Sequence, residues 1–267
     1  MMRRAIGHAA TVALVAFAQP ALAESIAIPF APPVGRTLRY HIEQHRPVGD
    51  RISSFSATRD LRFEKAGDGY VLAATLRAID SDAPASGAES YRAALGPLVG
   101  IEMRFRLDGH GRIVAVDDRD AVWAKVLAGV DTMLAGFAPD SERHRAAQRV
   151  QALFASLSPE GRLALLAGEF QPLFLFSGSS VEDGAGRGLR TMAGSPLGRP
   201  VPVEGTLTVA AQAGDGLDLD EKLAGDGVQV TIRYHLSRVT GLVESQARNL
   251  AVGTQALTES RSLTPVP

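Results

Sequence analysis

The chain has 267 residues, of which 45% are hydrophobic and 21% charged, a composition typical of a globular protein. Its 28 basic residues nearly balance its 29 acidic ones, so we expect no nucleic-acid partner. Cysteine is absent, which excludes disulfides, cysteine nucleophiles and thiolate metal sites.

The first 23 residues are typical of a cleavable export signal. Arg3 and Arg4 precede an apolar run without formal charge over 5–18, and Ala21-Leu22-Ala23 is a small-x-small cleavage site. The run is shorter than the roughly 20 apolar residues of a membrane helix, and no later segment supplies such a length. We therefore expect cleavage near Ala23, release into the periplasm or beyond, and no transmembrane segment in the mature chain. With 26 basic and 29 acidic residues, that chain would carry a net charge of −3.

Alternating apolar and polar residues predict strands in two parts of the chain. The pattern is clear over 38–42 and 101–107, and it returns from residue 201 onward with short Gly-Asp-Gly turns. Arg59 interrupts the apolar face of the second strand. Because Ile52 has the opposite parity to that face, we expect a β-bulge near Ser53 and Ser54.

Between these β regions the apolar spacing becomes helical. Residues 119–137 form an amphipathic pattern, and Ser141 and Ser158 are good N-caps for two further helices that end near Gly168. A short helix is also expected over 88–95.

In two stretches after the helices, apolar and polar residues follow no clear helical or strand pattern. Residues 170–176 form either an apolar strand or a buried connection, and periodicity does not decide between them. Residues 177–197 are rich in glycine and serine, so we expect a mobile loop there.

These elements predict an α+β fold with residues 24–267 in a single β-rich domain. A helical insertion covers about 119–168. Nine or ten antiparallel strands with one apolar face should form a strongly curved sheet, a half-barrel or incomplete barrel, with the helical insertion packed on that apolar face.

If such a sheet is open at one side, its inward-facing residues would line a cavity suited to a lipid or acyl chain. Trp123, the only tryptophan, lies on the apolar stripe of the first long helix, where it either packs in the core or contacts a ligand. The candidate ligand-binding residues are Leu38, Tyr40, Phe63, Met103, Phe105 and Trp123.

One strand also carries candidate metal ligands. His41, Glu43 and His45 share one face, and two imidazoles with a carboxylate can hold zinc and activate a water. The alternative is the solvent-facing side of an exposed strand, because the opposite parity is apolar.

Other motifs favour turns and loops over chemistry. The acidic residues over 215–221 lack calcium-loop spacing, and the glycines over 184–188 lack the lysine and hydroxyl of a phosphate loop. The sequence contains no Gly-x-Ser-x-Gly, Ser-x-x-Lys or His-Glu-x-x-His motif. We therefore expect neither a cofactor nor catalysis by a recognisable triad.

Two short strand-turn-strand segments are the most similar to a known family: Leu107-Asp108-Gly109-His110-Gly111 and Thr240-Gly241-Leu242-Val243. Together with export and strands on both sides of a helical insertion, they give a layout that resembles periplasmic lipoprotein carriers and mycobacterial lipoproteins of the half-barrel type. The resemblance implies a curved sheet that wraps around helices and holds an acyl chain. The lipobox cysteine of the anchored members is missing, and no functional residue carries over.

Three functions remain open from the sequence. The first is an exported, non-catalytic protein that binds a lipid, another apolar small molecule or a partner protein of the cell envelope. The second is a structural or interaction protein of the envelope that docks through an exposed sheet edge. The third is a metal-dependent hydrolase that uses His41, Glu43 and His45.

Overall fold

The computed structural model describes residues 24–184, 186–193, 201–253 and 255–267, so the predicted export signal lies outside the described residues. A strand-rich first part leads into a helical middle and a strand-rich last part. In chain order the elements are β1 (Ser25–Ile28), β2 (Thr37–Val48), β3 (Arg51–Ala66), β4 (Gly69–Ser81), α1 (Ala85–Leu95), η1 (Gly96–Leu98), β5 (Glu102–Leu107), β6 (Ile113–Val116), α2 (Arg119–Ala135), α3 (Glu142–Ser156), α4 (Pro159–Ala167), η2 (Gln171–Phe174), β7 (Ser179–Glu182), β8 (Arg187–Ala193), β9 (Val201–Ala213), β10 (Gly216–Gly225), β11 (Val228–Ser237), β12 (Val243–Val252) and β13 (Gln255–Pro265).

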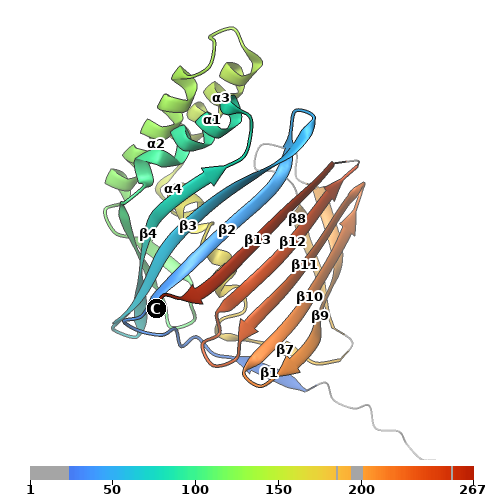
Figure 1. Cartoon of the computed structure of the whole chain (residues 1–267). Helices are drawn as coiled ribbons and strands as arrows, with labels where there is room; N and C mark the ends of the chain where they lie inside the picture. Colours follow the sequence, from blue (N-terminus) through green and yellow to red (C-terminus); the bar gives the residue numbers. More distant parts are fainter. Residues whose placement is uncertain (1–23, 185, 194–200, 254) are drawn as a thin grey trace, which may run out of the picture.

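Eleven strands form one antiparallel sheet that is not closed into a barrel, in the order β6-β5-β4-β3-β2-β13-β12-β11-β10-β9-β8. Strands β2 to β6, the N-terminal half-sheet, and β8 to β13, the C-terminal half-sheet, each pair with their neighbours in sequence. The halves join where β13 pairs with β2, for example at Leu263 and Tyr40. Figure 1 shows this junction in the middle of the sheet, with α1, α2 and α3 gathered on the β4 side.

The N-terminal half-sheet buries its inward face under the helical middle. Helix α2 contributes Val122, Trp123 and Val126 to this core, and α4 contributes Leu166. The segment over 170–176 is a buried connection that contains η2, not a strand. Along the described residues, no helix is long and apolar enough to cross a membrane.

A second hydrophobic core lies on the inward face of the C-terminal half-sheet, and strands β1 and β7 contribute to it. Strand β1 pairs with β7, placing Ile26 opposite Val181, and both side chains join the inward residues of β9 to β12. Phe176 packs edge-on against Tyr234 at 5.1 Å between ring centroids.

The stretch predicted as a mobile loop instead carries two strands, β7 and β8, and its residues 185 and 194–197 lie outside the described part. Strand β7 pairs with β1, about 150 residues earlier in the chain, and β8 pairs with β9. Both strands depend on partners supplied by tertiary structure, which local composition does not reveal.

The bulge predicted near Ser53 and Ser54 is wrong. Pairing of β3 with β2 is continuous through both residues, and Ile52 lies exposed opposite Pro47 near the hairpin end. The register shift falls instead between Thr58 and Arg59 in the pairing of β3 with β4. Ile52 is out of step with the apolar residues of β3 because it faces solvent at the end of the hairpin, and no bulge is needed to account for it.

Candidate functional site

The six predicted ligand-binding side chains come together, but in a filled core. Each is at most 5% exposed. Phe170 packs 5.0 Å from Phe105 and 6.4 Å from Tyr40 between ring centroids, and Phe174 packs 6.1 Å from Phe63. The protein's own aromatic side chains therefore occupy the space beside these residues, and their role in ligand binding stays a prediction.

The candidate metal ligands follow the outward face of β2. His41 Nδ1 lies 3.0 Å from Thr58 Oγ1, and His45 Nε2 lies 3.6 Å from Glu43 Oε1. Across the part of the chain that the structure describes, no three side chains of histidine, aspartate or glutamate gather to hold a metal ion. The zinc site stays a prediction without a structural argument in its favour.

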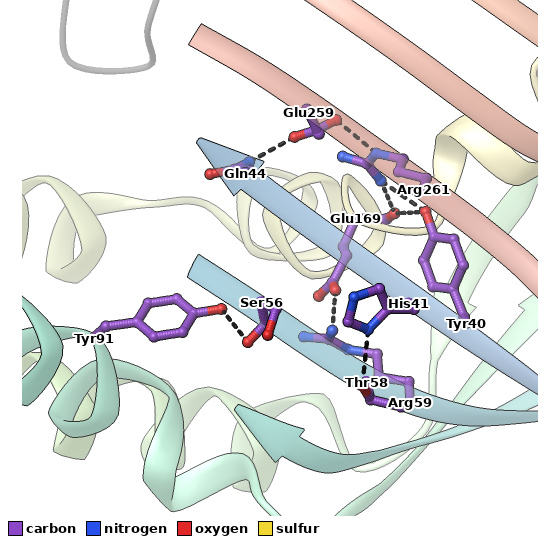
Figure 2. A network of polar contacts seen from close by, with 10 residues as sticks. All are labelled: Tyr40, His41, Gln44, Ser56, Thr58, Arg59, Tyr91, Glu169, Glu259 and Arg261. Carbon is purple, nitrogen blue, oxygen red and sulfur yellow. Dashed lines mark hydrogen bonds and ion pairs between the residues drawn. The ribbon is translucent and has the colours of Figure 1, made fainter. Parts of the chain in front are cut away.

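A buried polar network lies on the opposite, inward face of the sheet, and Figure 2 shows its members. Arg59, only 3% exposed, forms an ion pair with Glu169, which follows α4. Arg261 donates from Nη1 to the Tyr40 hydroxyl at 2.7 Å and to the Glu169 carbonyl oxygen at 2.8 Å, and from Nε to Glu259 at 2.7 Å. The network therefore anchors the segment after α4 to both half-sheets.

Burial and hydrogen bonding shift the acidity of this network in opposite directions. Burial raises the pKa of Tyr40 to about 12, so its hydroxyl stays protonated and can donate. Burial also opposes ionisation of Glu259, but hydrogen bonds from Arg261 and from Gln44, the latter at 2.5 Å, hold the pKa of this carboxyl below its ordinary value. Burial likewise raises the pKa of the Glu169 carboxyl, although the charges of Arg59 and Arg261 oppose this shift. In this network the arginines therefore favour ionised carboxyls where burial opposes ionisation.

The strand registers extend this polarity across the C-terminal half-sheet. Pairings between adjacent strands align one inward row, formed by Glu221, Ile232, Arg248, Glu259 and Gln44. Within this row Glu259 has its partners in Arg261 and Gln44, and Glu221 accepts a hydrogen bond from the Tyr234 hydroxyl at 2.9 Å. Charged side chains therefore stand where the N-terminal half-sheet has mostly apolar ones.

A cavity of about 380 Å³ lies between this face and the segment over 168–175. Leu175, Leu223, Val230 and Ile232 supply apolar walls, and Gln246 and the charged row supply polar ones. The complete lining is Gly168, Gln171, Pro172, Leu175, Thr191, Met192, Ala193, Glu221, Leu223, Val230, Ile232, Tyr234, Gln246, Arg248, Glu259 and Arg261.

Two polar atoms beside this cavity are buried without a hydrogen-bond partner among the described residues: Oε1 of Gln246 and Nε of Arg248. Buried polar groups are nearly always hydrogen-bonded in folded proteins, and leaving one unpaired costs about 1–3 kcal/mol. Beside a cavity, such atoms could form hydrogen bonds with a bound molecule.

Two further hollows, of about 510 and 590 Å³, lie along the outward face of β10 to β13. Several of their charged groups pair with one another, since Arg233 lies 3.8 Å from Asp220 and His235 lies 2.6 Å from Asp218. These contacts place Asp218 and Asp220 of the acidic cluster on the outward face, whereas Glu221 faces inward. The inward cavity is therefore the stronger candidate site.

No protein-family model matches the chain, and no curated protein matches it significantly.

The residues of this cavity were missed from the sequence, although a signal was present. Arg248, Glu259 and Arg261 alternate with small residues such as Ala247 and Ser260. When charged residues alternate with small ones along a strand, either set can face the interior of the sheet. The sequence pattern alone therefore does not show which set is buried.

Proposed function

We propose that this protein is exported, non-catalytic, and binds an apolar or amphiphilic molecule, such as a lipid or acyl chain, in the cavity of the C-terminal half-sheet. The observation that carries the proposal is a cavity with apolar and polar walls and with two buried, unpartnered polar atoms beside it. In this proposal the sheet curves around the segment over 168–175 as a half-barrel.

The size of the cavity supports a small ligand. Small-molecule sites commonly have volumes of roughly 300–1,000 Å³. Taking roughly 30 Å³ for each heavy atom, 380 Å³ accommodates about a dozen heavy atoms. A short alkyl chain fits this space, and a larger lipid would have part of its mass outside it.

The direct test compares binding of dodecanol, a plain alkyl probe, by wild type and by a variant with a filled cavity. Ile232→Trp places a bulky ring among the apolar walls, whereas Thr231→Trp places it on the outward face of the same strand. We expect wild type and Thr231→Trp to bind one dodecanol per chain in native mass spectrometry, and Ile232→Trp to bind at least tenfold more weakly. Circular dichroism checks that both variants fold.

Failure of wild type to bind dodecanol would contradict the proposal, as would equal binding by both variants. Native mass spectrometry of gently purified wild-type protein adds an independent readout, because a co-purified lipid should appear as a discrete added mass.

A second candidate is an interaction protein of the envelope that docks through strand β8. Within the described residues β8 pairs only with β9, so its other edge presents unpaired backbone groups, and Met192 is 58% exposed on it. Crosslinking from β8 in the native envelope should capture one defined partner. A monomer without any crosslinked partner would contradict this alternative.

A further inference from the structure

The guanidinium of Arg248 is the one charged group of the inward row whose partner is missing among the described residues. It lines the cavity from β12, its Nε is buried without a hydrogen-bond partner, and no carboxylate of the described chain lies within 4.0 Å of it. Arg248 is half-buried as a whole, and a charged group with a buried, unpaired donor is costly unless something compensates it. A negative group bound beside this Nε would compensate it.

The neighbouring carboxylates form no ion pair with Arg248, although its charge helps to lower the pKa of Glu259. Glu259, next in the row, has its two oxygens bound to Arg261 and Gln44. Glu221 lies two strands away, about 10 Å at ordinary strand spacing, and accepts the hydrogen bond of Tyr234. Both acids are therefore held by other groups, and Arg248 remains available.

Gln246 provides a second polar contact on the same wall. It lies two residues before Arg248 on β12, so both side chains face the cavity. Gln246 is only 7% exposed, and its Oε1 has no hydrogen-bond partner in the described part of the chain. The amide Nε2 of Gln246 can donate to a charged oxygen of a head group, whereas Oε1 can only accept, for example from a hydroxyl of the same head group.

We propose that the cavity binds a single-chain amphiphile with an anionic head, whose carboxylate or phosphate oxygens bind Arg248 and Gln246 while its alkyl chain lies against Leu223, Val230 and Leu175. This inference rests on the proposed function and adds the charge of the ligand. A guanidinium matches both oxyanions, because its planar set of donors can bind two oxygens at once.

The test measures the affinities of four probes with the same twelve-carbon chain: dodecanoate, dodecyl phosphate, dodecanol and dodecyltrimethylammonium. Isothermal titration below the micelle concentration compares wild type with Arg248→Gln and with the control Arg233→Gln. Arg233 is exposed on the outward face of the adjacent strand, so its loss changes net charge equally without touching the cavity.

For wild type we expect dodecanoate, dodecyl phosphate or both to bind at least tenfold more tightly than dodecanol, and the cationic probe to bind most weakly. Arg248→Gln should abolish this preference by weakening binding of the anions much more than binding of dodecanol, and Arg233→Gln should keep it. The probe that shows the preference distinguishes a carboxylate head from a phosphate head.

Equal affinity of wild type for dodecanol and both anions would overturn the inference while leaving the proposed function intact. A preference retained in Arg248→Gln would also overturn it. Failure of all four probes to bind wild type would overturn both proposals.

Discussion

The two half-sheets use the same antiparallel meander but cover their inward faces differently. The N-terminal half-sheet packs against α2, α4 and the aromatic side chains of Phe170 and Phe174. The C-terminal half-sheet packs part of its face against the β1 and β7 pair and leaves a cavity beside Arg248. One meander is thus covered by its own helices, and the other has a cavity on its inward face.

The difference follows from which residues point inward. On β4 and β5 the inward positions are apolar, such as Leu72, Met103 and Phe105, and close packing of apolar side chains excludes solvent. On β12 and β13 the inward positions include Gln246, Arg248 and Glu259, whose polar groups need partners. Inward polarity therefore distinguishes a structural core from a candidate binding surface.

The largest expected effect is loss of core packing in the N-terminal half-sheet. Phe105→Ala removes a fully buried ring that packs on Phe170, and we expect it to lower the free energy of unfolding by about 3–5 kcal/mol. Ile232→Ala, on the cavity wall, should cost less, about 2 kcal/mol or below, because its side chain already borders empty space. Urea denaturation of both variants measures the difference, and equal losses would contradict the distinction between the two halves.

The next effect concerns the ion pair that anchors the segment after α4. Arg59→Ala leaves the Glu169 carboxylate without its partner in a largely buried setting, and we expect a loss of about 3 kcal/mol. The matched control is Arg190→Ala, which removes an exposed pair with Glu204 and should cost at most about 1 kcal/mol. Thermal unfolding compares the two, and a similar small shift for both would show that the buried pair does not anchor the segment.

The smallest of these effects is a dependence of stability on pH. Because the pKa of Glu259 in the folded state lies below its ordinary value, its contribution to stability is fully present above the unfolded-state pKa of about 4.5 and is lost as pH falls through the folded-state pKa. Glu259→Gln should therefore lose less stability than wild type between neutral and acidic pH. Denaturant unfolding across this range measures the change.

Glu89→Gln serves as the control for the pH dependence, since Glu89 lies exposed on α1. Its acid sensitivity should match that of wild type. Identical pH profiles for wild type and Glu259→Gln would contradict the role assigned to the Glu259 hydrogen bonds.

Local patterns predicted most of the strands and helices but not the surfaces they build. Alternation locates β2 and β5, and apolar spacing locates α2, because both follow from which side of an element is buried. Strand β1 has only four residues and depends on β7, a partner far along the chain. A short strand of this kind lacks a local signal.

The cavity could not be predicted for a related reason. Its lining brings the segment over 168–175 against strands β10 to β13. The register between β2 and β13 likewise brings Gln44 to Glu259 across 215 positions of sequence. Arg59 did stand out as a charge on an apolar face, but its partner Glu169 comes from a helix end whose position is set by packing. Pairings at such distances follow from the assembled sheet and not from neighbouring residues.

The most direct measurement of the proposed binding is a crystal structure of the protein with 12-bromododecanoate, whose bromine can be located by anomalous scattering. We expect one bromine peak among Leu175, Val230 and Ile232, and carboxylate density within hydrogen-bond distance of Arg248. A bromine peak only elsewhere on the protein, or an empty cavity at saturating probe, would contradict a ligand site in the C-terminal half-sheet.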